Sequence, residues 1–190
     1  MAVTTLHLVR HGQSEWNQSR RLQGQVADVP LTPLGLEQAR TAANALAGRN
    51  VVAVHSSDLL RARRTAEVIG TALRLPVELD AGLREQSYGT LEGLPSADVL
   101  AAAPYDFTDP DARAPGGESI RDVHERVGRC LASYAKRYAG RECVLVSHGD
   151  AIRIGLAWLA GRGPADVPWH EAANGSVTTV RLPPLEFSAR

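Results

Sequence analysis

Two short motifs place a histidine before a glycine directly after an apolar run. The stretch LHLV continues into RHG at His11, and the stretch CVLV continues into SHG at His148. Short apolar runs of this kind are typical of buried strands, and ligands bind at the carboxyl ends of strands in open α/β sheets. Glycine after each histidine permits a tight turn and a close approach of backbone N–H groups to a ligand. We therefore expect the two histidines to face one cleft.

The elements that must position these motifs alternate between strand and helix patterns, which predicts an α/β fold. Thr32 before Pro33 is an N-cap followed by a first-turn proline, and Ser119 with Asp122 fits a capping box. The predicted strands span 4–9, 51–55, 142–147 and 176–182, and the predicted helices span 33–48, 58–74, 96–103, 119–138 and 150–160.

The segment from 80 to 117 shows weaker periodicity than the rest. It holds Pro95, Pro104, Pro110 and Pro115 and the acidic run DFTDPD. Proline at this density interrupts regular elements, so we expect an irregular excursion that contains only the short helix 96–103.

Composition sets limits on the class of protein. A chain of 190 residues that is 44% hydrophobic can bury the core of one domain, which we assign to residues 1–190. The 21 basic side chains balance 21 acidic ones, which argues against a nucleic acid or a membrane as partner. No apolar run approaches the roughly 20 residues that span a bilayer, and we expect a cytoplasmic protein. Cys130 and Cys143 have no metal-ligand spacing and are expected to be small buried hydrophobes.

The conjunction of motifs is more specific than either histidine motif alone. In order along the chain they are LVRHGQSEWN at 8–17, LQG at 22–24, PLTPLG at 30–35, SSDLLRARRTA at 56–66, LREQSYGTLEG at 83–93, GGES at 116–119 and SHGD at 147–150. Across nearly the whole chain this set resembles the histidine phosphatase superfamily, in its phosphoglycerate mutase-like branch. The resemblance implies a three-layer α/β/α sandwich around a mostly parallel, mixed central sheet.

The resemblance also implies a role for each matching residue. His11 would be the nucleophile that takes the phosphoryl group as a phosphohistidine, and Glu85 would protonate the leaving group. The phosphate would be bound by Arg10, Asn17, Arg61 and His148, and the remainder of the substrate by Gln23, Gly24 and Tyr88. No metal and no cofactor are expected.

Chemistry gives independent reasons for these residue types. A phosphoryl group in transfer spreads negative charge over its equatorial oxygens, and guanidinium groups match those oxygens bidentately. An imidazole nucleophile must be neutral, and we expect a backbone carbonyl near Gly12 to orient it. A glutamate can act as the acid at Glu85 if its pKa is raised, which a neighbouring phosphate would favour.

The reaction that follows phosphohistidine formation distinguishes three hypotheses. Mutases of this family carry Glu-Arg-His-Tyr-Gly at the acid position, whereas this chain reads EQSYG from Glu85. Their longer insert with basic residues is also replaced here by a short one with Asp98, Asp106, Asp109 and Asp111 against Arg113. We therefore expect a metal-independent phosphomonoesterase acting on a small phosphorylated metabolite. The alternatives are a phosphoglycerate mutase and a non-catalytic phosphate-binding regulatory module. Oligomeric state stays open, since an edge strand over 176–182 would allow a homodimer.

Overall fold

The computed structural model describes residues 3–102, 106, 108–169 and 172–183. Its centre is a five-stranded sheet in the order β3-β2-β4-β1-β5. The strands are β1 (Thr4–Arg10), β2 (Val51–Ser56), β3 (Val77–Leu79), β4 (Glu142–Ser147) and β5 (Val177–Leu182). All neighbouring pairs are parallel except β1 with β5, which is antiparallel. The predicted mixed, mostly parallel sheet is confirmed.

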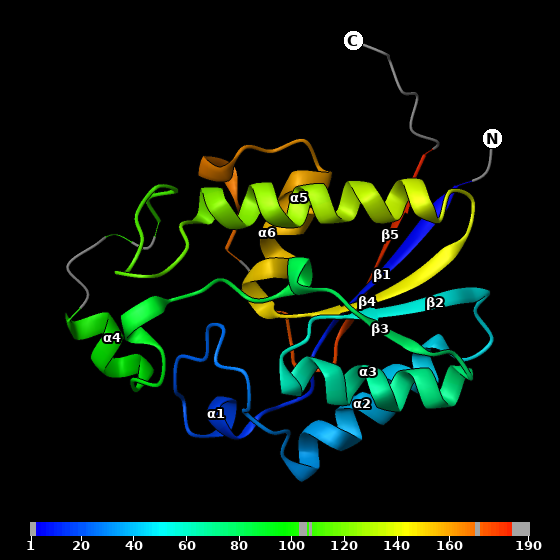
Figure 1. The fold of residues 1–190 in the computed structure, drawn as a ribbon, viewed down its shortest axis with the longest axis horizontal. Helices are drawn as coiled ribbons and strands as arrows, with labels where there is room; N and C mark the ends of the chain where they lie inside the picture. The colour runs from blue at the N-terminus through cyan, green and yellow to red at the C-terminus, as the bar shows by residue number, and fades with distance from the viewer. Residues whose placement is uncertain (1–2, 103–105, 107, 170–171, 184–190) are drawn as a thin grey trace.

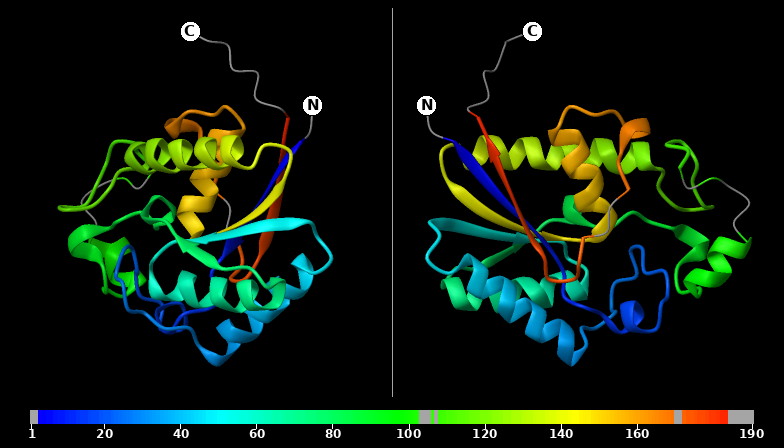
Figure 2. Two further views of the ribbon diagram at one scale, coloured as in Figure 1. Left: turned by 45° about the vertical axis from the view of Figure 1, so that its right-hand side comes forward. Right: turned by 180° about the vertical axis from the view of Figure 1, so that it is seen from behind.

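Helices cover both faces of this sheet. On one face lie α2 (Pro33–Leu46) and α3 (Leu60–Leu73), and on the other lie α5 (Ile120–Arg137) and α6 (Gly149–Leu159) (Figure 1). Figure 2 shows the same layers from two further sides, with β5 beside β1 at one edge of the sheet. The predicted α/β/α layering is confirmed, and residue 103, the last of the predicted helix 96–103, lies outside the described residues.

The core forms because successive strand residues face opposite layers. In β4, Cys143 and Leu145 pack toward α5 and α6, whereas Val144 and Val146 pack toward α2 and α3. All four side chains are fully buried. A strand buried on both faces reads as a continuous apolar run, which is why CVLV carries no polar alternation.

The two histidine motifs start from the same edge of the sheet. Arg10 at the end of β1 is the register partner of Ser147 at the end of β4. The backbone N–H of His11 donates to the Ser147 carbonyl at 3.0 Å. The short helices α1 (Glu15–Gln18) and α4 (Ser96–Ala102) lie beyond these carboxyl ends (Figure 1).

The predicted start of the second predicted helix, at residue 58, is wrong by two residues, since α3 begins at Leu60. Leu59 is the N-cap of α3, and the Asp58 carboxylate instead accepts two hydrogen bonds from the Arg84 guanidinium. The ion pair holds Asp58 toward the excursion rather than over the helix terminus. The predicted start of the last predicted helix, at residue 150, differs by one residue, since α6 begins at Gly149.

Several short elements were not expected from the sequence. They are α1, β3 and the 3₁₀ turns η1 (Ala81–Leu83), η2 (Gly89–Leu91) and η3 (Pro164–Asp166). Each is too short to display a period. Within the described ranges, no helix is both long and apolar enough to cross a membrane.

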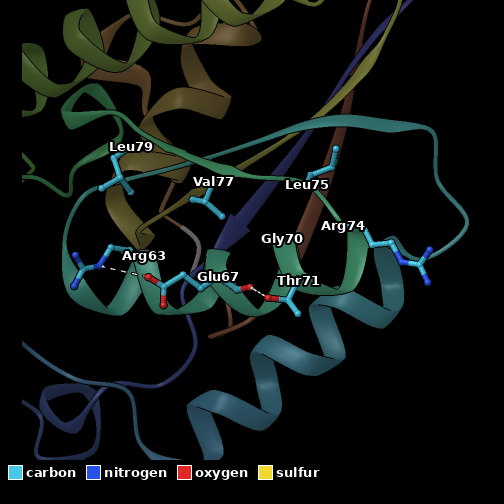
Figure 3. Close-up of a pocket in the computed structure, with 8 residues that line it drawn as sticks. All are labelled: Arg63, Glu67, Gly70, Thr71, Arg74, Leu75, Val77 and Leu79. Atoms are coloured by element: carbon cyan, nitrogen blue, oxygen red, sulfur yellow. Dashed lines mark hydrogen bonds and ion pairs between the residues drawn. The ribbon is translucent and has the colours of Figure 1, made fainter.

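An open hollow of about 460 Å³ lies on the outside of the molecule between α3 and the edge strand β3. Figure 3 shows its polar side chains, Arg63 with Glu67 and Thr71, on α3 and its apolar ones, Leu75, Val77 and Leu79, on the opposite wall. None of the predicted site residues lines this hollow. It is therefore set apart from the cleft at the strand ends.

Candidate active site

His11 lies directly after β1 and is only 2% exposed. Its Nδ1 is 2.7 Å from the carbonyl oxygen of Gly12, the partner expected from the sequence. Because a carbonyl oxygen only accepts, Nδ1 carries the hydrogen and Nε2 keeps a lone pair. Burial, followed by the charge of Arg61 and that of Arg10, lowers the pKa of His11 well below 6.5. The imidazole is therefore neutral at pH 7.

His148 faces His11, as predicted, with 5.1 Å between the ring centroids. Nε2 of His148 forms a 2.8 Å hydrogen bond with the hydroxyl of Ser57. Its Nδ1 is buried and has no hydrogen-bond partner among the described residues. A buried, unpaired ring nitrogen is costly unless a ligand meets it. Burial and the nearby charge of Arg61 lower the pKa of this histidine well below 6.5.

Arg61, from the first turn of α3, is fully buried. Its two terminal nitrogens donate to the carbonyls of Val26 and Gly24 at 3.0 and 2.7 Å. Burial lowers the pKa of Arg61 to about 10, which leaves it protonated at neutral pH. Arg10 donates to the carbonyl of Ala172. Two guanidinium groups thus stand fixed beside the neutral His11.

These side chains open into one cavity of about 150 Å³, which we call the site cavity. Its lining includes all the predicted site residues except His148: Arg10, His11, Asn17, Gln23, Gly24, Arg61, Glu85 and Tyr88. The sequence analysis did not select Arg21, Ser96 or Asp150, which also line it. Asp150 directly follows the SHG motif, and that adjacency was a usable signal. Arg21, in an irregular segment, and Ser96, at the start of the short helix α4, had no such signal.

The loop that carries Gln23 and Gly24 is anchored by hydrogen bonds. The single hydroxyl hydrogen of Ser14 is shared between two acceptors, Oε1 of Gln23 at 2.7 Å and Oδ1 of Asn17 at 3.0 Å. Oδ1 of Asn17 also accepts from the Ser14 N–H and from the Asn174 amide. The oxygen of Asn17 is therefore occupied, and its amide N–H₂ is the group that it can offer to an anion in the site cavity.

Gly12 is required by close backbone packing rather than by its φ. A Cβ at Gly12 would clash with the carbonyl oxygen of Gly35, and one at Gly35 would clash with the carbonyl oxygen of Gln13. The two glycines let the start of α2 approach the chain directly after His11. This contact fixes the position of the His11 backbone.

Glu85 reaches the site cavity from the excursion. Its carboxylate accepts from the backbone N–H groups of Asp150 and Ala151, at 3.2 and 2.9 Å, in the first turn of α6. It also accepts from the Gln86 N–H at 3.0 Å. Burial first, and then the charge of Asp150, raise the pKa of Glu85 above 4.5. Such a shift favours a carboxyl group that holds a proton in the weakly acidic range.

A half-buried clamp holds the backbone on either side of Glu85. Arg126 of α5 donates to the carbonyls of Gly82, Arg84 and Glu85 at 2.9–3.1 Å. The same guanidinium pairs with Glu118 through two hydrogen bonds of 2.8 Å. The sequence analysis missed this clamp, because an arginine on an amphipathic helix reads as a solvated side chain.

Tyr88 lies on the outer side of Glu85. Its hydroxyl donates to Oδ2 of Asp150 at 2.7 Å, and Arg153 donates to Oδ1 of the same carboxylate at 2.9 and 3.1 Å. Burial, with the charges of Asp150 and Glu85, raises the pKa of Tyr88 well above 10. The phenol is therefore a neutral donor beside the site.

Comparison with known proteins agrees with this geometry. A family model described as the histidine phosphatase superfamily, branch 1, matches residues 6–189. The chain is 39% identical over 162 residues to the probable phosphoglycerate mutase GpmB of Citrobacter koseri, covering 82% of this chain and 74% of that protein. The probable GpmB of Salmonella choleraesuis is 38% identical with the same coverage.

Solved structures of phosphatases are similar over more of the chain. A mycobacterial glucosyl-3-phosphoglycerate phosphatase in complex with VO3 has a TM-score of 0.85 and 34% identity, covering 92% of this chain and 90% of that one. A mutant phosphoserine phosphatase from Entamoeba histolytica in complex with phosphoserine has a TM-score of 0.83 and 30% identity, covering 93% and 89%. On the match of nearly its whole length, the chain belongs to branch 1 of the histidine phosphatase superfamily.

Proposed function

We propose that this protein is a phosphomonoesterase that hydrolyses a small phosphorylated metabolite through a phosphohistidine on His11, without a metal ion. Its family and its similar structures support a phosphatase or mutase enzyme. The single observation that carries the proposal is the hydrogen bond from His11 to the Gly12 carbonyl. It fixes the tautomer in which Nε2 is free to attack, in a site cavity that also holds Arg10 and Arg61.

In the first step, Nε2 of His11 attacks phosphorus. The Nε2–P bond forms, the P–O bond to the alcohol breaks, and the proton held by Glu85 moves to the leaving oxygen. Arg10, Arg61 and the facing His148 meet the charge on the equatorial oxygens. Fixed guanidinium groups supply the positive charge that other phosphoryl-transfer sites obtain from a metal ion.

In the second step, water replaces the alcohol. The deprotonated Glu85 accepts a proton from water as the new P–O bond forms and the Nε2–P bond breaks. Inorganic phosphate leaves, and Glu85 is again protonated while His11 is neutral. One carboxyl group therefore serves as acid and then as base, which suits its raised pKa.

Hydrolysis rather than transfer back to a sugar acid is supported by the outer wall of the site. A mutase needs cations for the substrate carboxylate, but two of the cations on the leaving-group side, Arg113 and Arg153, are already paired. Arg113 pairs with Asp122 at 3.1 Å, and Arg153 pairs with Asp150 at 2.9 Å. The similar solved structures named above are phosphatases by their titles.

Phosphoglycerate mutase is the second candidate, because the curated relatives carry the name probable phosphoglycerate mutase. The two functions are separated by what accepts the phosphoryl group. A mutase interconverts the phosphoglycerates and depends on a bisphosphate primer, whereas the proposed phosphatase releases phosphate without one.

The proposal is tested by phosphate release from a panel of phosphomonoesters in EDTA, for the wild type and for His11→Ala. We expect release that survives the chelator and is lost in the variant. If no ester of the panel releases phosphate but phosphoglycerates interconvert when the bisphosphate primer is added, the protein is a mutase. If neither phosphate release nor interconversion is detected while phosphate binding is retained, the protein is a non-catalytic phosphate-binding module.

A further inference from the structure

A second hollow of about 300 Å³ adjoins the site cavity, and we call it the apolar chamber. The two share Leu22, Tyr88, Ser96 and Asp150 as lining residues, so a group bound at His11 would extend from one into the other. The remaining wall comes from α4, the segment 112–114, the start of α5 and Trp169. This volume is at the lower end of the range for small-molecule sites, about 300–1,000 Å³.

The surface that lines the apolar chamber is mainly hydrocarbon, although polar and charged side chains also contribute to it. Val99, Ala114 and Ile120 are buried, and Leu22 is half-buried. Trp169 is 82% exposed although it is large and aromatic. Its ring lies under the Arg153 guanidinium, 5.0 Å from the ring centroid. An exposed indole at the mouth of an apolar hollow is a surface on which an apolar body can pack.

The charged and amide side chains of the chamber wall already pair with other groups of the protein. The hydroxyl of Tyr88 and the guanidinium of Arg153 both donate to Asp150. Arg113 pairs with Asp122, and the side-chain amide of Gln86 donates to the Glu118 carbonyl at 2.8 Å. A substrate carboxylate or sugar hydroxyl in the chamber would have to lose water and displace one of these bonds, which costs affinity.

We infer that the substrate of this enzyme is the phosphate monoester of an apolar alcohol, aliphatic or aromatic, whose hydrocarbon body fills the apolar chamber. This inference rests on the proposed function for the phosphoryl end of the molecule. The site cavity binds the phosphate and the chamber selects the alcohol. Polar esters of glycerol, glyceric acid or hexoses are poor substrates, because the charged and amide side chains of the chamber are already paired with other protein groups.

Binding of non-hydrolysable phosphonates tests the inference independently of turnover. Dissociation constants are measured by calorimetry for ethyl-, butyl- and hexylphosphonate, with inorganic phosphate as the reference. We expect affinity to rise about three- to fourfold for each added methylene, the factor for burying one CH₂ group. We also expect 3-phosphonopropionate, which carries a carboxylate, to bind more weakly than butylphosphonate.

A variant assigns the effect to the chamber. Val99→Thr keeps the shape of the side chain and places a hydroxyl in the wall, so the gain from butyl- to hexylphosphonate is expected to fall about fivefold. Val52→Thr makes the same change at an exposed position of β2 and is the matched control. Trp169→Ala, at an exposed residue that cannot unfold the core, is expected to weaken hexylphosphonate more than ethylphosphonate.

Affinity that is flat or falls with chain length would overturn the inference, as would tighter binding of 3-phosphonopropionate than of butylphosphonate. Failure to bind hexylphosphonate at all would also overturn it. Failure of the proposed function gives a different result: no ester releases phosphate, while the dependence of phosphonate affinity on chain length is retained.

Discussion

The site cavity and the apolar chamber share four lining residues, but the rest of their walls comes from different parts of the chain. The site cavity is lined from the end of β1 and the first turns of α3 and α6, together with the loop 21–24 and Glu85 and Tyr88 of the excursion. The chamber is enclosed mainly by α4 and the irregular segment that leads into α5. His11, Arg10 and Arg61, which meet the charged phosphoryl group, lie at the ends of regular elements, whereas an irregular excursion shapes much of the space for the alcohol. Catalysis and substrate choice can therefore be altered separately.

The largest expected effect comes from the site cavity. His11→Ala removes the attacking nitrogen, so phosphate release is expected to fall by at least about 10⁴-fold for alkyl and aryl esters alike. Steady-state kinetics with both classes of ester measure this loss. His124→Ala, on α5 where Nε2 of the ring hydrogen-bonds with the Arg162 carbonyl, is the matched control and is expected to keep full activity. A folded His11→Ala protein with substantial turnover would remove the nucleophile from the account.

A smaller loss is expected when the fork of Arg61 is lost. In Arg61→Lys a single ammonium group cannot hold the carbonyls of Gly24 and Val26 and also meet the phosphate, so kcat/KM is expected to fall about 10³-fold. Arg64→Lys, on the exposed side of the same helix, is the control. Equal activity of the two variants would show that Arg61 does not contact the transferring group.

Glu85→Gln is expected to affect esters according to their leaving group. Alkyl esters are expected to lose about 10²-fold in kcat, and p-nitrophenyl phosphate less than about tenfold, because a good leaving group needs little protonation. The pH profile provides a second readout. Because His11 must be neutral to attack, the wild-type rate is expected to fall toward acid pH, on a limb that lies below pH 6.5. Because Glu85 must be protonated to act as the acid, the rate is also expected to fall toward alkaline pH, on a limb that lies above pH 4.5.

The alkaline limb due to Glu85 is expected to vanish in Glu85→Gln, while titration of the ester itself, near pH 6, remains in both proteins. Equal losses for alkyl and aryl esters, with an unchanged pH profile, would assign Glu85 to binding rather than to proton transfer.

The smallest effect is expected at the clamp of Arg126 and Glu118, which holds the backbone around Glu85. Arg126→Gln frees the backbone carbonyls around Glu85, and we expect kcat for alkyl esters to fall about tenfold with little change in KM. A positioning role predicts no further loss when Arg126→Gln is combined with Glu85→Gln, and partial rescue by Arg126→Lys. Additive losses would mean that Arg126 acts by another route, such as general stability.

The sequence predicted the site cavity better than its surroundings, for a physical reason. The histidines of RHG and SHG follow strands that are buried on both faces, so their apolar runs are clear and their ends must meet at one edge of a parallel sheet. The N-caps Thr32 and Ser119 were equally readable, because each side chain satisfies a helix N–H in its own segment.

What could not be predicted depends on contacts between distant segments. Nothing local to Arg126 indicates that it holds three carbonyls some forty residues away. The three residues of β3 are too few to show alternation, and the chamber wall follows no period. Asp58 was assigned to a helix because it suits an N-terminus, but its pairing with Arg84 prevailed.

The phosphohistidine on His11 is tested most directly by trapping the phosphoryl-enzyme. The wild type is mixed with a phosphomonoester in EDTA and quenched in alkali, which preserves a phosphohistidine, and the labelled peptide is identified by mass spectrometry. We expect phosphate on the peptide that contains His11, and we expect no labelled protein with the His11→Ala variant. A phosphoryl group on another residue, or phosphate release by a His11→Ala protein that carries no label, would contradict it.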